Sequence, residues 1–321
     1  MARFLVRRIV YGLFVIWLVT VLVFGIFFIG GGAASVARRL AGKEATPQIV
    51  NLIRQRLLLN KPIYLQYWHF LYELLHGNLG YSYIHGQPVT TVIAQAFPIT
   101  LSLVLGAAAI WLVIGILSGV LSAVRRGSVW DRMATAIALF FYSMPVFVLG
   151  LLLQFVFYYE FTIHGIHIFP APGYTSFTTD PSLWFRGLIL PWITLALVSA
   201  AVYTRLVRGS MLDVMGEDYI RTARAKGLTE RRVIYRHSLR AALNPVVSQF
   251  GIDVGTLLGG AILTEWTFGM PGVGYVAVVS IQQQDLPVII GIVIVAAAAV
   301  VVVNIGVDVL YAVLDPRVRL H

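Results

Sequence analysis

The chain of 321 residues contains no cysteine and few charged residues. The missing cysteines exclude a disulfide framework, a thiolate metal site and a cysteine nucleophile. Asp, Glu, Lys and Arg together supply 12% of the residues, about half the share of an ordinary soluble domain. Apolar residues make up 59%, and the mean hydropathy is +0.83. Such a chain would expose too much apolar surface in water, so lipid must surround most of it.

The motifs of common catalytic sites are also missing from the sequence. There is no G-x-x-x-x-G-K-[ST] phosphate loop, no H-E-x-x-H zinc motif, no G-x-S-x-G nucleophile turn and no pair of carboxylates within one apolar run. The nearest phosphate-loop fragment, Gly42-Lys43-Glu44, lacks both the loop and the hydroxyl. His164 and His167 are either a metal pair or an ordinary loop pair, with Glu160 as the only acid nearby. We therefore expect no catalytic residue, cofactor or metal on this chain.

Six apolar runs are long enough to cross a hydrocarbon core of about 30 Å as helices. They cover residues 9–30, 99–124, 133–159, 187–204, 246–264 and 286–307. The first run follows three arginines, but its 22 residues exceed the 7–15 or so of a signal peptide, so we predict a retained span. Pro98, Pro191, Pro245 and Pro287 lie near predicted helix starts, whereas Pro145 lies inside the third run and should kink it.

The basic residues indicate the orientation of these spans. With the N-terminus inside, the inner segments hold 17 of the 24 Lys and Arg residues, nine of them in the connection 205–244. This bias is typical of cytoplasmic loops, so both termini are predicted to be cytoplasmic. The domains expected are the N-terminus with the first span (1–30), an extracytoplasmic segment (31–97), a core of five spans (98–313) and a cytoplasmic tail (314–321).

The outer connection 31–97 allows two interpretations. Residues 48–59 have the pattern of an amphipathic helix, residues 64–75 are rich in aromatics that suit an interface, and residues 77–82 have the composition of a turn. The segment is either a small ordered cap on the outer face or a tether that lies along the lipid.

One acidic residue lies deep in the fifth run. A carboxylate there costs a few kcal/mol unless it faces protein or water. Asp253 therefore lines a polar pathway, carries a proton or bonds to a neighbouring helix; together with Gln249 it is our candidate for a translocation pathway. Gly251, Gly255 and Gly259 repeat every four residues along the same run, which favours close packing of a second helix.

The connection 205–244 has the pattern of two helices and a sharp turn. The first begins near Glu217, and Gly227 is placed to end it with a positive φ. Thr229 can cap a second helix that runs to Leu243. The hairpin either anchors the chain on anionic headgroups or fits its small residues, such as Ala223, into a groove on another protein.

This hairpin resembles the "EAA" loop of binding-protein-dependent ABC importer permeases, in the form used by the dipeptide, oligopeptide and nickel branch. Arg221-Thr222-Ala223 occupies the Glu-Ala-Ala triplet, and Gly227 matches the glycine of the pattern. The proline of the general pattern is Arg240 here. Nearly the whole chain shows the resemblance, in segments 77–82, 98–101, 265–268, 271–274 and 314–317.

The resemblance implies an all-α type I importer fold and a transport subunit without catalytic activity. It implies a second homologous permease subunit, two ABC ATPase subunits that bind ATP and Mg, and an extracytoplasmic substrate-binding protein, in a prokaryotic inner membrane. The loop 217–243 would couple to the ATPases through Asp218, Tyr219, Arg221, Thr222, Ala223, Lys226 and Gly227. The cargo would be a short peptide, a nickel chelate or a glutathione-like solute.

Two functions of other classes fit the sequence less well. A self-sufficient secondary transporter should show inverted repeats and several partnered charges within its spans, and neither is evident in the sequence. An intramembrane enzyme would need a nucleophile and a base, and no plausible pair is present.

Overall fold

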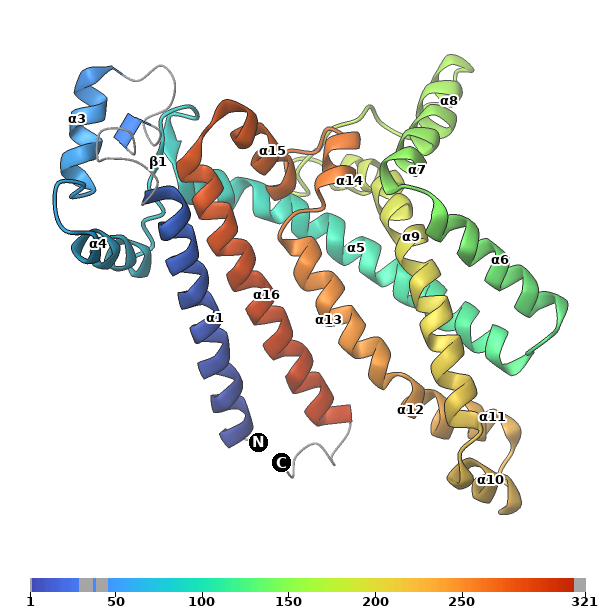
Figure 1. Cartoon of the computed structure of the whole chain (residues 1–321). Helices are drawn as coiled ribbons and strands as arrows, with labels where there is room; N and C mark the ends of the chain where they lie inside the picture. The colour runs from blue at the N-terminus through green and yellow to red at the C-terminus, as the bar shows by residue number, and fades with distance from the viewer. Residues whose placement is uncertain (1, 29–36, 39–45, 315–321) are drawn as a thin grey trace. The chain divides into compact units, whose positions relative to one another are not determined.

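A computed structural model describes residues 2–28, 37–38 and 46–314 (Figure 1). The predicted end of the first span at residues 29–30 and the tail 315–321 lie outside this part. The elements are α1 (Ala2–Phe28), α3 (Pro47–Arg56), α4 (Ile63–Leu75), β1 (Tyr81–Ser82), β2 (Gln87–Pro88), α5 (Val89–Val124), α6 (Val129–Ser143), α7 (Val146–Leu153), η1 (Gln154–Glu160), α8 (Phe161–Ile163), α9 (Pro181–Met215), α10 (Asp218–Ala225), α11 (Glu230–Arg232), η2 (Val233–Ser238), α12 (Leu239–Ala242), α13 (Asn244–Leu258), α14 (Ile262–Thr267), α15 (Val273–Gln283) and α16 (Leu286–Leu314). The predicted all-α class is confirmed, with one short β-hairpin.

Five helical stretches among the described residues are long and apolar enough to cross a membrane: 6–28, 89–124, 146–163, 181–215 and 286–309. The predicted fifth span is α13, which is shorter. It ends at Leu258 rather than Thr264, since Gly260 adopts a φ of +130° that a helix cannot contain. The chain then turns and resumes as α14.

Three prolines differ from their predicted roles. The third span breaks at Pro145 rather than kinking there: α6 ends at Ser143, and Met144 is extended before α7 begins. A proline disfavours helical backbone in the residue before it, which explains the break. Pro98 and Pro191 lie inside α5 and α9, because those helices begin at Val89 and Pro181, well before the apolar runs.

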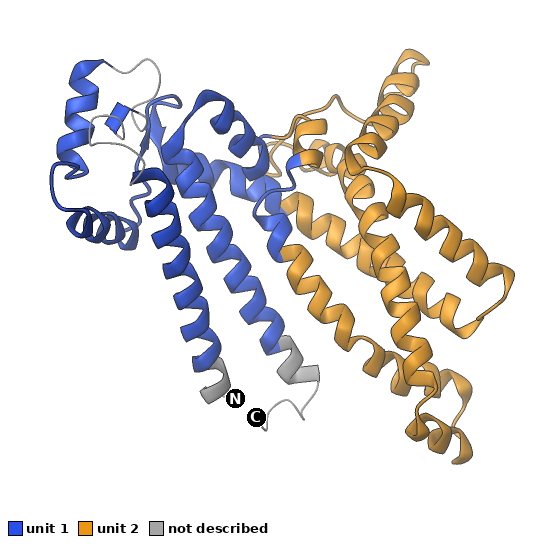
Figure 2. Ribbon diagram, in the orientation of Figure 1, with its two compact units in different colours: residues 1–101, 255–262, 271–321 blue, residues 102–254, 263–270 orange. Residues whose placement is uncertain are grey.

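The chain forms two units, residues 1–101, 255–262 and 271–321 in the first and residues 102–254 and 263–270 in the second (Figure 2). In the first unit α1 packs along α16. Arg8 Nε lies 3.0 Å from Asp308 Oδ2, so the start of α1 and the end of α16 lie on the same side.

The described part of the segment 31–97 is folded into helices and a short β-hairpin and belongs to the first unit. Its helix α4 packs on α1 through the rings of Phe24, Phe28 and Phe70, whose centroids lie 4.7 to 5.8 Å apart. The hydroxyls of Thr20 and Tyr67 are hydrogen-bonded at 3.0 Å. Helices α3 and α4 match the predicted runs 48–59 and 64–75 closely.

The second unit is organised around α9, the helix that contacts α6, α7, α12 and η2. Its buried residues include Tyr203 and Val207, which are fully enclosed. Helix α5 approaches α9 at Gly119, where an added Cβ would lie 2.6 Å from Val207 Cβ and 2.9 Å from the Thr204 carbonyl oxygen. Only glycine permits this approach.

Candidate functional site

The hairpin 217–243 turns at Gly227, whose φ is +77°. The Gly227 N–H donates to the Arg224 carbonyl at 2.9 Å, and the Leu228 N–H donates to the Ala223 carbonyl at 3.4 Å. These two bonds form a Schellman motif, the helix ending that requires a left-handed residue. The predicted turn at Gly227 is thus present, and the space around its Cα is open.

A small apolar core holds the two arms of the hairpin together. Ile220 and Val233 are fully buried and Ala223 is 8% exposed, with Leu228 packed against them. Ala223 packs within this core, where a larger side chain would separate the arms. Arg224 adds a two-point ion pair with Glu230 across the turn, at 2.8 and 3.1 Å, which lowers the pKa of the Glu230 carboxyl.

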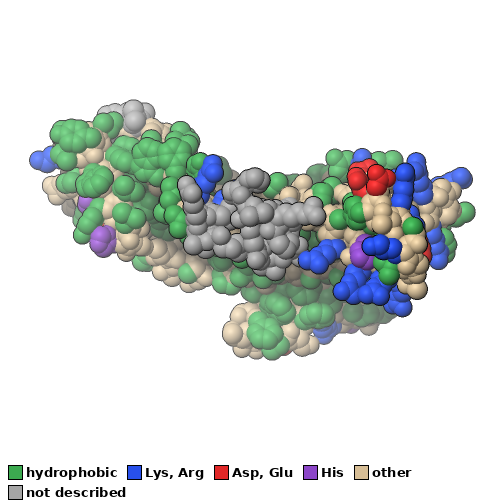
Figure 3. All heavy atoms as spheres, turned by 90° about the horizontal axis from the view of Figure 1, so that it is seen from below, with side chains coloured by type: hydrophobic (Ala, Val, Ile, Leu, Met, Phe, Trp, Pro, Cys, Tyr) green, Lys and Arg blue, Asp and Glu red, His purple; other side chains and the backbone are tan. Residues whose placement is uncertain are grey.

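The other predicted coupling residues lie on the outside of the hairpin. Figure 3 shows Lys and Arg side chains gathered on the face that carries it. The exposed members of the predicted set are Asp218, Tyr219, Arg221, Thr222, Lys226 and Gly227. Tyr219 is a large aromatic side chain that is 48% exposed. Thr229 precedes α11, as predicted, but its side chain makes no capping hydrogen bond.

A partly buried ion pair joins α6 to α9, and no local sequence pattern indicates it. Arg208 of α9 donates from Nε and Nη2 to the two carboxylate oxygens of Asp131, at 2.8 and 3.0 Å. The Asp131 carboxylate also accepts from the Ser122 hydroxyl and from the Gly127 N–H. These donors, Arg208 first among them, hold the pKa of Asp131 well below its usual value. Helices α5, α6 and α9 thus meet at one carboxylate.

Asp253 of α13 is held by two side chains of the second unit. The Tyr203 hydroxyl donates to Oδ2 at 2.8 Å, and Gln249 Nε2 donates to Oδ1 at 2.8 Å. Among the described residues no Lys, Arg or His forms an ion pair with Asp253. Ser248, Ile252 and Thr256 of the same helix are exposed, and their spacing of four puts them on one face beside Gln249 and Asp253. This mostly polar face would be costly against lipid.

The three glycines that repeat every four residues along α13 and just past its end differ in their surroundings. A Cβ on Gly255 would lie 3.5 Å from the Val300 backbone, and one on Gly259 would lie 3.3 Å from Ala296 Cβ, both in α16. Gly251 is buried. The stripe of small residues therefore faces α16 at its later positions.

A second buried carboxylate was also missed. Asp285, which is 2% exposed, accepts from the Ser82 hydroxyl, and its Oδ2 lies 3.0 Å from His85 Nδ1. The contacts tie the hairpin β1–β2 to the start of α16. A separation of about 200 residues leaves no sequence signal for such a cluster. As for His164 and His167, the described residues contain no group of three or more His, Cys, Asp or Glu side chains arranged to hold a metal.

Two family models together match most of the chain. Residues 112–320 match the family described as "Binding-protein-dependent transport system inner membrane component", and residues 1–104 match its N-terminal membrane component. The glutathione transport system permease protein GsiC of Escherichia coli strain K12 is 38% identical over 320 residues, 99% of each chain. A probable peptide ABC transporter permease protein of Sinorhizobium fredii is 35% identical over 319 residues, 99% of this chain and 100% of the relative.

Among solved structures, an inward-facing form of the MetNI methionine ABC transporter matches with a TM-score of 0.52 at 22% identity. The match covers 70% of this chain and 96% of that one, and it supports the fold alone. The chain belongs to the family of binding-protein-dependent transport system inner membrane components, and it is a multi-pass permease subunit of an ABC importer in a bacterial inner membrane.

Proposed function

We propose that this subunit imports short peptides together with partner chains, and that the hairpin 217–243 transmits the force. A second homologous permease subunit would complete the pathway, two ATPase subunits would bind ATP and Mg, and an extracytoplasmic binding protein would deliver cargo. The observation that carries the proposal is the hairpin itself. It has its own buried core, a Schellman turn and an exposed aromatic side chain, and these are properties of a rigid docking element.

In this proposal the outward-facing residues Asp218, Tyr219, Arg221, Thr222 and Lys226 contact an ATPase subunit. Gly227 and Ala223 determine the shape of the hairpin, because Gly227 permits the turn and Ala223 permits the arms to close. A lipid anchor would need only the cations, not an enclosed core of its own.

Asp253 and Gln249 are proposed to face the translocation pathway. The exposed, mostly polar face of α13 supports this, since water or cargo would satisfy it better than lipid would. The Tyr203 bond keeps the carboxylate in place on that face. Gly251, Gly255 and Gly259 are proposed to keep α13 close to its neighbours.

Cross-linking tests the docking role directly, because the chain has no cysteine and a single introduced thiol is unique. A Tyr219→Cys variant carrying a photoreactive maleimide is expected to cross-link to the ATPase subunit in membranes of the intact complex. Tyr72→Cys is the matched control, since Tyr72 is similarly exposed but lies in the outer segment. Cross-links from position 219 to lipid alone would contradict the proposal.

Glutathione is the second candidate cargo, because a relative named a glutathione transport system permease is 38% identical to this chain. Uptake of a labelled tripeptide should be measured with unlabelled peptides, glutathione or a nickel chelate as competitors. Competition by peptides but not by glutathione supports peptide import. The reverse would assign the chain to glutathione-like solutes.

A further inference from the structure

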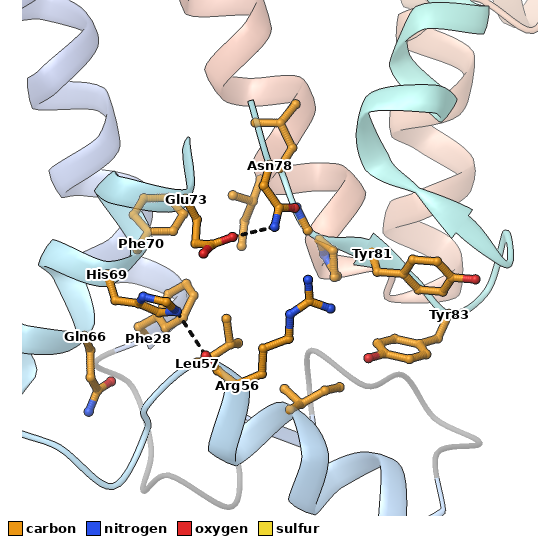
Figure 4. A pocket seen from close by; sticks show the side chains of 15 residues that line it. Phe28, Arg56, Leu57, Gln66, His69, Phe70, Glu73, Asn78, Tyr81 and Tyr83 are labelled. Carbon is orange, nitrogen blue, oxygen red and sulfur yellow. Dashed lines mark hydrogen bonds between the residues drawn. The ribbon is translucent and has the colours of Figure 1, made fainter. Parts of the chain in front are cut away.

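The outer part of the first unit contains a cavity of about 110 Å³. Its walls come from the end of α1, from α3 and α4, from the strand region 78–83 and from the start of α16 (Figure 4). Phe28, Leu57, Phe70 and Ile290 give it a largely apolar lining. A water molecule needs about 10–15 Å³ on this scale and occupies about 30 Å³ of liquid, so the space is equivalent to roughly 7–11 waters and suits a dipeptide or a phospholipid headgroup.

Hydrogen bonds fix the walls of this cavity. A ring nitrogen of His69 lies 3.0 Å from the Arg56 carbonyl oxygen, which joins α4 to the end of α3. The Gln66 amide donates to the carbonyls of Leu59 and Lys61 and closes the turn between these helices. At the other end of α4, Asn78 donates to a carboxylate oxygen of Glu73. The cavity is therefore a built feature rather than a gap between loose loops.

Two side chains of opposite charge line this cavity without pairing. Arg56 extends into the space in Figure 4, and Glu73 lies on the α4 wall. Neither of them forms an ion pair within 4.0 Å, with each other or with any other described residue. Opposite charges beside an apolar lining attract strongly when water is displaced. Their separation leaves one cationic and one anionic contact open to a ligand.

We propose that this cavity binds a zwitterionic, partly apolar ligand. Arg56 would hold its anionic group, Glu73 its ammonium group, and the rings of Phe28 and Phe70 its apolar part. Two sources share this chemistry: a short peptide with free termini, and the phosphoethanolamine headgroup of a lipid. The inference rests on the proposed function only for the choice of a peptide as one probe.

The test is a binding titration on the purified full-length chain in detergent with no ATPase present. The probes are the dipeptide Ala-Leu, glycerophosphoethanolamine, and N-acetyl-Ala-Leu-amide, which lacks both charges. We expect the first or the second probe to bind and the capped peptide to bind at least tenfold more weakly, and the probe that binds identifies the source. Because the hairpin 217–243 takes no part in this assay, its result is independent of the docking proposal.

Variants assign the binding to the cavity. Arg56→Gln and Glu73→Gln should each weaken the probe tenfold or more. Lys61→Gln should leave binding unchanged, because Lys61 is exposed nearby but its side chain does not line the cavity. No binding by either zwitterion, or equal binding of the capped peptide by the wild-type chain, would overturn the proposal whether or not a variant folds. Binding that both substitutions leave unchanged would overturn it as well.

Discussion

Arg208 donates hydrogen bonds to both carboxylate oxygens of Asp131, at 2.8 and 3.0 Å. Arg208 lies in α9, nine residues before the hairpin 217–243 begins. The carboxylate is 5% exposed, and the Ser122 hydroxyl and the Gly127 N–H complete its shell of donors. A displacement of this end of α9 must therefore break the cluster or carry α5 and α6 along with it.

Replacing Asp131 by Asn should destabilise the folded chain by about 2–3 kcal/mol, because it leaves the Arg208 charge without its partner. The figure is smaller than the roughly 3–5 kcal/mol of a fully buried pair, since the Arg208 side chain is 31% exposed. Thermal unfolding of the purified subunit measures the effect. Asp213→Asn is the control, because Asp213 lies exposed on α9, the helix of Arg208. An equal loss of stability in both variants would argue against the ion pair.

Acid should weaken the wild-type chain more than the Asp131→Asn variant. The pKa of Asp131 is lower in the folded state than in the unfolded state. Its contribution to the free energy of unfolding is therefore complete above the unfolded value of about 3.9 and is lost as the pH falls through the lower folded value. The difference between the unfolding temperatures of the two proteins should stay constant from about pH 7 to pH 5 and should narrow as the pH falls from about 4 to 2. Parallel curves would show that Asp131 contributes no pH dependence.

Gly227→Asp should abolish uptake while the protein still inserts into the membrane. The substitution meets no neighbouring atom, but a side chain at φ +77° costs about 1–2 kcal/mol and distorts the turn. Gly165→Asp is a matched control, because Gly165 has a φ of +79° and equally open surroundings in a loop outside the hairpin. Transport assays in cells, with membrane levels quantified, should separate the two. Normal uptake by the Gly227 variant would remove the coupling role.

Asp253→Asn should alter cargo preference more than stability. An amide keeps a partner for the Tyr203 hydroxyl but removes the charge, which should shift the preference between Lys-containing and Glu-containing peptides by about 5–10-fold, the equivalent of roughly 1–1.4 kcal/mol. Competition uptake assays measure this ratio. Tyr203→Phe retains the charge and should change the ratio less. If the Asn variant loses assembly with unchanged selectivity, packing explains Asp253 better.

Gly119→Ala should destabilise the second unit by about 1–3 kcal/mol, because its methyl group would overlap Val207 and push α5 away from α9. Gly306→Ala provides the control, since Gly306 lies in α16 with no atom within 4 Å of its added Cβ. Unfolding temperatures of both variants in detergent give the comparison. Tolerance at both positions would show that the two helices do not need this close contact.

Much of the fold was predictable because lipid imposes simple rules on sequence. Long apolar runs indicate α1, α5, α9 and α16, and the sequence also predicts the turn with positive φ at Gly227. The predicted length of the fifth span was wrong. The apolar pattern continues past Gly260, but the φ of +130° at this residue cannot belong to a helix.

The buried polar clusters were not predictable from the sequence. Ser82 and Asp285 lie 203 positions apart, and Arg208 and Asp131 lie 77 apart. The local sequence around these four residues does not indicate which of them pair, because such contacts depend on how the helices pack. The same holds for Ala223, where the sequence showed a small residue and only the packing showed that it lies in one buried cluster with Val233.

The length of α9 bears on how the hairpin meets its surroundings. Its 35 residues extend about 52 Å, well beyond a hydrocarbon core of about 30 Å. The stretch from Arg205 to Met215 alone adds about 16 Å past the apolar run. If α9 crosses upright, that stretch places α10 beyond the lipid phosphates. A soluble protein can then contact α10 without entering the membrane surface.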